Sequence, residues 1–136
     1  MDGLRITDLD ERGGLAVDLK SILSAGGSGA IECLSRCSHV WATTHEDATE
    51  TLEEVAASGR MISGARLMEL AHQTYWVEDG LFECFMPGAE RPWFVIDVVD
   101  STFWDVRSED PGLLDRLRAE YHQVTRLPPV SGQGHG

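Results

Sequence analysis

The chain has 136 residues, enough for one domain that buries its own hydrophobic core and needs no metal ion or disulfide to fold. Its 23 acidic and 11 basic residues give a formal net charge of −12, which repels nucleic-acid phosphates and anionic membranes and attracts basic surfaces. We therefore expect neither a nucleic-acid partner nor a membrane partner, and no apolar run is long enough to cross a bilayer.

The three cysteines, Cys33, Cys37 and Cys84, follow no spacing that is typical of a disulfide framework. Unpaired thiols are usual in the reducing cytosol. The first residues also lack the basic and apolar regions of a signal peptide. These features together predict a cytoplasmic protein.

The first third of the chain predicts one helix and one strand. Residues 1–13 are polar and are expected to form a mobile lead-in. Apolar residues at helical spacing predict a short helix over 15–23, which the glycine-rich turn 25–29 ends. Alternating residues over 30–43 then predict a strand, with Trp41 on the same face as the cysteines.

A helix is predicted from Thr44, which can cap its N-terminus, to Gly59, which can end it in the left-handed conformation. One face of this helix is rich in acids. A solvated helix face is the simpler interpretation, and a surface that binds a basic partner is the functional one. The acids are Glu46, Asp47, Glu50, Glu53 and Glu54.

The middle of the chain holds the strongest strand signals. A helix over 64–73, capped by Ser63, precedes them. The pair Asp79-Gly80 favours a type I′ hairpin turn between strands 74–78 and 81–86. The run Trp93–Val99 is almost entirely apolar, which predicts a central strand covered on both faces.

The last third predicts a tight turn, a strand, a helix and a tail. Asp100-Ser101 is a turn leading into a strand over 102–107, and Asp110-Pro111 is typical of a helix start. Prolines, glycines and small polar residues predict a disordered tail over 127–136.

Helices and antiparallel strands are segregated in this order, which predicts an α+β fold. We expect a single domain over 1–126, with a mainly antiparallel sheet of about five strands packed against three to four helices.

No motif in the sequence predicts a metal site or a cofactor. Cys33, Cys37, His39 and His45 have suitable side chains, but residues four apart on a strand are separated by about 13 Å, too far to share one ion. A nucleophilic pair of one cysteine and one histidine is assembled in space, so the spacing neither supports nor excludes it.

Asp97 interrupts the apolar run and must be paired or functional. The simpler interpretation is an ion pair with Arg107 or Arg91. Alternatively, Asp97, Asp100 and Asp105 converge into a group of carboxylates that performs acid–base chemistry or binds a cation.

Alternation places Trp76 and Trp104 on the face opposite the main core, where an exposed pair would mark a contact surface. A ligand pocket between the sheet and the helix over 64–73 is the alternative, with His72, Tyr75 and Asp97 as its polar groups.

The leading functional hypothesis is a small acidic binding or regulatory protein, of the immunity or antitoxin kind, that engages a basic protein. Its binding surface is expected to centre on the acids of residues 46–54 and to extend to the edge that carries Asp97, Asp100 and Asp105. A small enzyme or small-molecule-binding protein is the alternative, although the lack of a catalytic motif favours a protein that is not an enzyme. A homodimer formed through a sheet edge or the Trp76/Trp104 patch is a third hypothesis.

Overall fold

The computed structural model describes residues 1–128. The predicted tail 127–136 therefore lies outside the described residues from position 129 on. Its first residue, Leu127, belongs to a strand and is almost buried, so the ordered chain extends past the boundary expected at 126.

Within the described residues, seven antiparallel strands form one sheet in the order β3-β2-β4-β5-β6-β1-β7. The strands are β1 (Asp2–Ile6), β2 (Leu34–Thr44), β3 (Ile62–Ser63), β4 (Thr74–Phe85), β5 (Phe94–Val99), β6 (Phe103–Ser108) and β7 (Val124–Leu127). The helices within residues 1–128 are α1 (Leu19–Ser24), α2 (Gly27–Glu32), α3 (Leu52–Ser58), α4 (Gly64–His72) and α5 (Pro111–Glu120).

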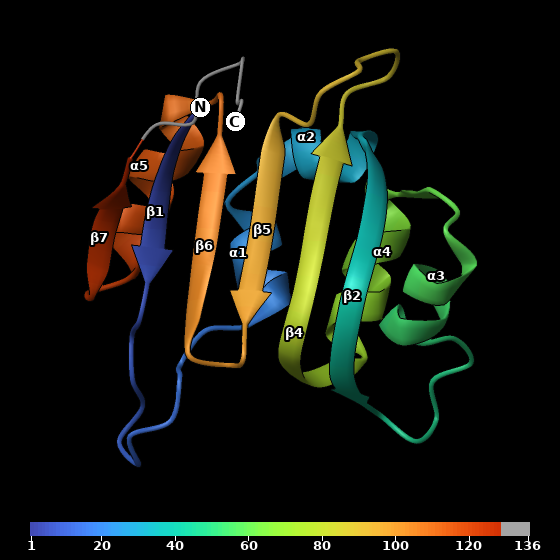
Figure 1. Ribbon diagram of the computed structural model, residues 1–136, viewed down its shortest axis with the longest axis horizontal. Helices are drawn as coiled ribbons and strands as arrows, with labels where there is room; N and C mark the ends of the chain where they lie inside the picture. The colour runs from blue at the N-terminus through green and yellow to red at the C-terminus, as the bar shows by residue number, and fades with distance from the viewer. Residues whose placement is uncertain (129–136) are drawn as a thin grey trace.

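The helices cover only one face of the sheet. Figure 1 shows α1, α2, α4 and α5 behind the strands, with α3 beside β2. The strands alternate accordingly: in β5, Phe94, Ile96 and Val98 are buried against the helices, while Val95 and Asp97 are half-buried on the other side. The second side of the sheet is an open face that meets solvent.

The predicted α+β class and the antiparallel sheet are confirmed, with more strands and helices than expected. The mobile lead-in was wrong in part, because Asp2–Ile6 forms β1 between β6 and β7. Leu4 and Ile6 lie in the core. Two inward residues are too short a pattern to predict a strand, and the long-range pairing supplies the rest.

A buried carboxylate joins the two ends of the described chain. Asp8 follows β1 and is nearly inaccessible to solvent. It accepts hydrogen bonds from the backbone N–H groups of His122 at 2.8 Å and Gln123 at 2.6 Å. These bonds satisfy the buried charge and hold the segment that leads into β7 against β1.

The hairpin predicted at Asp79-Gly80 does not form. The two expected strands are one continuous strand, β4, because β2 and β5 pair with it on both sides. Gly80 faces the core under the ring of Phe82, where an added Cβ would lie 2.7 Å from that ring. Positive φ angles occur instead at Asp100 and Ser101, so the tight turn predicted there joins β5 to β6.

β5 occupies the centre of the sheet, as predicted, but helices cover only one of its faces. A strand with this many apolar residues tolerates an open face because its outward side chains shield one another. Val95 and Asp97 are each only half-buried, whereas Val99 is exposed.

An irregularity in β2 changes which residues face the helices. Between the pairs Ser38–Leu81 and Trp41–Asp79, β2 contains one residue more than β4, and His39 takes a φ of 53° there. A single extra residue reverses the alternation of every residue that follows it. Trp41 therefore lies on the open face and not with Cys33 and Cys37, which are buried.

The glycine-rich segment forms part of a helix, α2, where a turn was predicted. Glycines disfavour helix by about 1 kcal/mol each, but here they permit close packing. A Cβ at Gly29 would lie 2.8 Å from the Trp93 ring, and a Cβ at Gly64 would lie 1.7 Å from the carbonyl oxygen of Ala30. Helices α2 and α4 thus approach to a distance that only glycine allows.

The second predicted helix, from Thr44 to Gly59, corresponds to α3 and begins later than expected. Thr44 ends β2, and Thr51 caps α3. The Thr51 hydroxyl accepts from the Glu54 N–H at 3.1 Å, and the Glu54 carboxylate accepts from the Thr51 N–H at 2.9 Å. This complete capping box outweighs the partial one at Thr44. Gly59 ends the helix in the left-handed conformation, as predicted, and Ser63 and Asp110 cap α4 and α5.

The close approach of α2 and α4 predicts a large cost for Gly64→Ala. The new methyl group would overlap the Ala30 carbonyl, so the free energy of unfolding should fall by about 3 kcal/mol. Urea unfolding followed by circular dichroism measures this change. Gly112→Ala is the matched control because its new methyl group meets only movable side-chain ends. Equal stability of the two variants would contradict the close packing.

Candidate functional site

The open face carries aromatic and acidic side chains side by side near the β5–β6 turn. Trp41 stands opposite Asp79 in the pairing of β2 with β4, and Asp97 stands opposite Asp105 in the pairing of β5 with β6. We call this region the Trp41/Asp97 surface. It consists of Trp41, Trp76, Asp79, Asp97, Val99, Phe103 and Asp105.

Two tryptophans of this surface are accessible to solvent. Trp41 is 65% exposed and Trp76 is 38% exposed. Trp76 pairs with Thr43, two residues beyond Trp41 in β2, so both rings lie on the open face. The expected Trp76/Trp104 patch was wrong in one member: Trp104 is 1% exposed and packs in the core, and Trp41 takes its place. The bulge at His39 is the feature that the alternation could not reveal.

Asp97 has no ion-pair or hydrogen-bond partner for its carboxylate among residues 1–128. The arginine pairing expected for it is wrong, because Arg107 donates to the backbone oxygen of Pro128 at 2.8 Å. Asp97 faces Asp105 across the strands, and Arg5 neutralises Asp105 through two hydrogen bonds of 2.8 and 2.9 Å. Partial burial, followed by the charges of Asp105 and Asp79, raises the pKa of Asp97 above its ordinary value.

Asp79 and Glu78 hold the β5–β6 turn against β4. The Asp79 carboxylate accepts from the Asp100 N–H at 2.8 Å, and the Glu78 carboxylate accepts from the Ser101 hydroxyl at 3.0 Å. Asp79, which was predicted to form a turn of its own, thus stabilises the turn between β5 and β6. Of the three predicted carboxylates, Asp97 and Asp105 converge on the open face, whereas Asp100 contributes its backbone to the turn.

Most basic side chains are already neutralised by acids of the same chain. Within residues 1–128, seven of the 11 basic side chains form ion pairs with seven of the 23 acids, leaving sixteen acids outside any ion pair. The paired arginines are Arg5, Arg36, Arg60, Arg66, Arg116, Arg118 and Arg126. Some of these sixteen, such as the buried Asp8, serve the fold, and the exposed ones carry the negative charge that a partner can reach.

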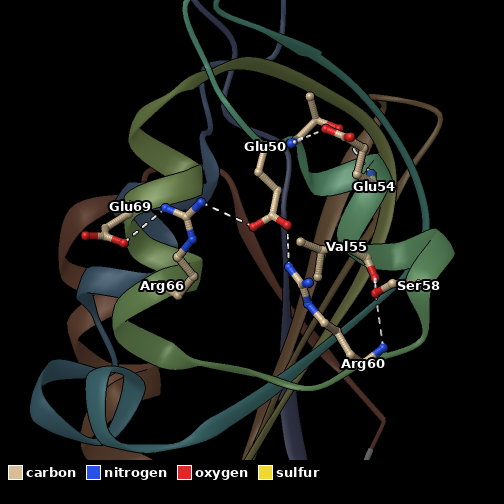
Figure 2. A network of polar contacts seen from close by, with 8 residues as sticks. Glu50, Glu54, Val55, Ser58, Arg60, Arg66 and Glu69 are labelled. Carbon is tan, nitrogen blue, oxygen red and sulfur yellow. Dashed lines mark hydrogen bonds and ion pairs between the residues drawn. The ribbon is translucent and has the colours of Figure 1, made fainter.

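The acids predicted on one helix face are divided between a loop and α3. Glu50 lies in the loop and forms ion pairs with Arg60 and with Arg66, the second at 3.2 Å (Figure 2). Arg66 also forms an ion pair with Glu69. The hydrogen bond from Arg60, with a further one from Arg66, holds the pKa of Glu50 below its ordinary value.

Glu54 completes the capping box of α3, so it too serves the fold. Glu46, Asp47 and Glu53 are exposed, and their carboxylates have no ion-pair partner within residues 1–128. Only these three of the five predicted acids are available to a partner.

A small cavity lies at the C-terminal end of α4. Its volume is about 200 Å³, and it is lined by His45, Asp47, Ala48, His72 and Gln73. The ring of Tyr75 stacks on the ring of His45 with 3.7 Å between their centroids. This cavity differs from the predicted pocket, because it lies between the end of α4 and the loop after β2. Of the three predicted polar groups only His72 lines it, whereas Tyr75 stacks on His45 and Asp97 lies on the open face. His45, Asp47 and Gln73 were not predicted as pocket residues.

The cysteines are buried and far from an ionised state at neutral pH, with one exception. Burial raises the pKa of Cys37 to about 12, and the hydrogen bond with Cys33 together with burial raises the pKa of Cys84. The same hydrogen bond lowers the pKa of Cys33 to about 7, but Cys33 is itself buried. The histidines proposed as partners, such as His72, are exposed, so no cysteine–histidine pair forms among the described residues.

Within residues 1–128, no group of three or more histidine, cysteine or acidic side chains could hold a metal ion. None of the helices in that range is long and apolar enough to span a membrane. Comparisons with known proteins find no matching family model, no matching curated protein and no matching solved structure.

The unpaired carboxylate predicts that Asp97→Asn stabilises the protein. The fold favours the neutral form of Asp97, so the ionised form lowers stability as the pH rises from about 4 through the raised pKa. The asparagine variant should be about 0.5 kcal/mol more stable at pH 7 and equal to the wild type below pH 4. Urea unfolding at both pH values measures this difference.

Glu83→Gln is the control on the same face, because Glu83 pairs with Arg36 across the strands at 3.1 Å. Removing its charge should not stabilise the protein. A loss of stability in Asp97→Asn would show that the carboxylate has a favourable partner and would contradict the assignment.

Proposed function

We propose that the protein is a small cytoplasmic binding protein that engages a basic protein partner through the Trp41/Asp97 surface. An immunity or antitoxin role, in which the chain masks a basic partner, is the function of this class that its size and charge favour. Nucleic acid and membranes are disfavoured as partners by the net charge of −12.

The observation that carries this proposal is the exposure of Trp41 on a sheet face that also carries Asp79 and Asp97, of which Asp97 has no ion-pair or hydrogen-bond partner among residues 1–128. Large aromatic side chains are normally buried, and tryptophan is the residue most enriched among those that dominate binding energy at interfaces. The exposed side chain of Val99 extends the apolar part of the same surface, while the Arg5 guanidinium lies 3.8 Å from the centre of the neighbouring Phe103 ring. An apolar centre with charged neighbours is the usual anatomy of a protein interface.

The charge of the surface favours a basic partner. Two carboxylates directly opposite each other on neighbouring strands cost stability, and only Asp105 is neutralised within the chain. An arginine or lysine from a partner would pair with Asp97 and remove this cost. A second copy of the chain would bring more negative charge, so a homodimer through this face is disfavoured.

The sequence placed the centre of the binding surface at the acids of residues 46–54 and its extension at the Asp97/Asp100/Asp105 edge, whereas the proposal places the centre on the sheet. Glu50 and Glu54 are engaged in contacts within the chain, which removes two charges from that region. The acids that remain free there lie in the loop before α3 and at its N-terminus, and contribute to long-range attraction.

The test is a comparison of variants in partner capture from the native cell extract. Trp41→Ser should weaken retention of a basic protein by about 30-fold, and Asp97→Asn by about tenfold. Quantitative mass spectrometry of the retained proteins at 50 and 300 mM salt measures both effects. Binding should be weaker at high salt because the attraction is electrostatic.

Two variants on the helix layer serve as controls, each matched to one test variant. Ile31→Ser removes an exposed apolar side chain from α2, and Glu32→Gln removes one charge from the same helix. Both should retain the partner as the wild type does. The proposal fails if Trp41→Ser and Asp97→Asn both retain the partner as well as the wild type does. It also fails if the amount of retained partner is the same at 50 and 300 mM salt.

A further inference from the structure

The outer edge of β7 is open for pairing with another strand. β7 is the last strand of the sheet, and within residues 1–128 it pairs only with β1. Figure 1 shows β7 at the margin of the sheet, with no helix or strand of the described chain beyond it. The outer backbone groups of such an edge strand are a template on which a further strand can form.

The pairing of β7 with β1 decides which backbone groups point outward. Just before β7, the carbonyl of Gln123 accepts from the Thr7 N–H at 2.9 Å, so Gln123 directs its backbone groups towards the chain that follows β1. In an antiparallel ladder, successive residues direct their N–H and C=O groups to opposite sides. Thr125 therefore bonds to β1, whereas Val124 and Arg126 direct both of their backbone groups away from the sheet.

The edge of β7 lacks features that prevent strands from pairing. Its pairing with β1 continues without a shift in register, and the strand contains no proline. Its only charged residue, Arg126, forms an ion pair with Asp2 of β1 at 4.0 Å. The opposite edge of the sheet is protected, because β3 has only 2 residues and α3 lies beside β2 (Figure 1). Very short strands and covering helices are common ways of blocking an edge.

The charge of the chain is distributed so that two copies can meet at this edge. β6, β1, β7 and α5 form one end of the molecule (Figure 1), within the segments 1–7 and 102–128. These segments hold six acids and five bases, a net charge of −1, so the rest of the chain carries −11 of the total of −12. Pairing β7 with the β7 of a second copy keeps the two acidic ends far apart, and their repulsion is screened by salt.

We propose that the protein forms a homodimer in which the β7 strands of two copies pair in antiparallel orientation across a two-fold axis. Thr125 lies on the axis, opposite Thr125 of the second copy. Val124 of each copy exchanges its outward backbone hydrogen bonds with Arg126 of the other. The two sheets thereby become one continuous sheet.

The register centred on Thr125 is favoured over its two neighbours. A register centred on Arg126 would place two arginines directly opposite each other, which is destabilising. A register centred on Val124 would require the N–H of His122, which already donates to the Asp8 carboxylate at 2.8 Å.

The dimer places both open faces on the same side. A two-fold axis that relates antiparallel edge strands is perpendicular to the sheet, so the helices of both copies cover one side and the two Trp41/Asp97 surfaces lie on the other. Such a dimer can engage two basic sites at once, which raises the overall affinity without any new contact. The pairing of β7 does not itself depend on the proposed function.

Sedimentation of the whole chain from about 1 to 200 µM tests the dimer directly. A strand of 4 residues offers a small interface, so we expect a reversible monomer–dimer equilibrium with a Kd on the order of 10 µM. The Kd should change less than about twofold between 50 and 300 mM salt, whereas capture of the basic partner weakens. A monomer at every concentration, or an oligomer larger than a dimer, would overturn the inference.

Two variants at position 126 locate the interface. Arg126→Pro removes an outward N–H and leaves the bonds to β1 in place, so it should weaken the dimer about 30-fold. Arg126→Ala keeps the N–H and should dimerise as the wild type does. Circular dichroism verifies that both variants fold. A folded Arg126→Pro variant with the Kd of the wild type would show that the copies meet elsewhere, and would overturn the inference.

Thr125→Cys provides a test that does not depend on the proline variant. Facing residues of a non-hydrogen-bonded pair have Cα atoms about 4.5 Å apart, which a disulfide can span. Oxidised glutathione should convert Thr125→Cys into a covalent dimer and leave Thr49→Cys, in an exposed loop, monomeric. The three native cysteines are buried and form no cross-link between copies. Failure of Thr125→Cys to cross-link, or equal cross-linking of the two variants, would overturn the inference.

Discussion

The bulge in β2 at His39 decides which side chains the open face presents. Up to Ser38, β2 and β4 pair without interruption, and Cys37 points into the core. One extra residue reverses the alternation and turns Trp41 outward. Without it, Trp41 would face the helices, and the exposed tryptophan beside Asp79 would not exist. A bulge that exposes a large aromatic ring is costly for a fold and is consistent with a surface kept for binding.

Two compensating irregularities in β4 complete the arrangement. The pairing shifts again between Trp41 and Ala42 and between Thr43 and Thr44, where β4 contains the additional residues. Trp76 thereby lies on the open face with Trp41, while Val77 returns to the core. The same end of β4 carries Tyr75, whose ring holds His45 at the edge of the cavity. One distorted end of two strands therefore positions both exposed tryptophans.

Electrostatics divide the acids of the chain into two groups with different tasks. Asp8, Glu50 and Glu54 satisfy backbone groups or arginines, and their removal should affect the fold. Asp97 has no such partner in the described residues, and its removal should affect binding. A residue whose replacement stabilises the protein and weakens binding is a mark of a surface maintained for function at the expense of stability.

The sequence predicted those elements whose signals are local. The caps Ser63 and Asp110, the left-handed Gly59 and the turn at Asp100-Ser101 each depend on neighbouring residues, and all four are present. The turn predicted at Asp79-Gly80 is absent because β2 and β5 pair with β4 on both sides and keep it continuous. A rule based on neighbouring residues does not include such long-range pairing.

Pairing between strands distant in the sequence also explains part of the errors in the candidate site. Trp41 faces the side opposite to the predicted one because alternation was extended through a bulge that only the partner strand reveals. Trp104 lies in the regularly paired β6, where it shares the core face with Val106. The meeting of Asp97 with Asp105 depended on strand order, and it was anticipated as one of two alternatives. The cavity was placed near the correct helix, but its lining from the loop after β2 depends on the Glu50 network, which joins residues distant in the sequence.

The most direct test of the central claim is photo-crosslinking in the native cell. A benzophenone amino acid is placed at position 41 on the open face or at position 65, an exposed site on the outside of α4. The account predicts that position 41 forms a covalent product with a basic protein, that added salt abolishes the product, and that position 65 gives none. A product from position 65 alone would show that the partner binds the helix layer, and would contradict the account.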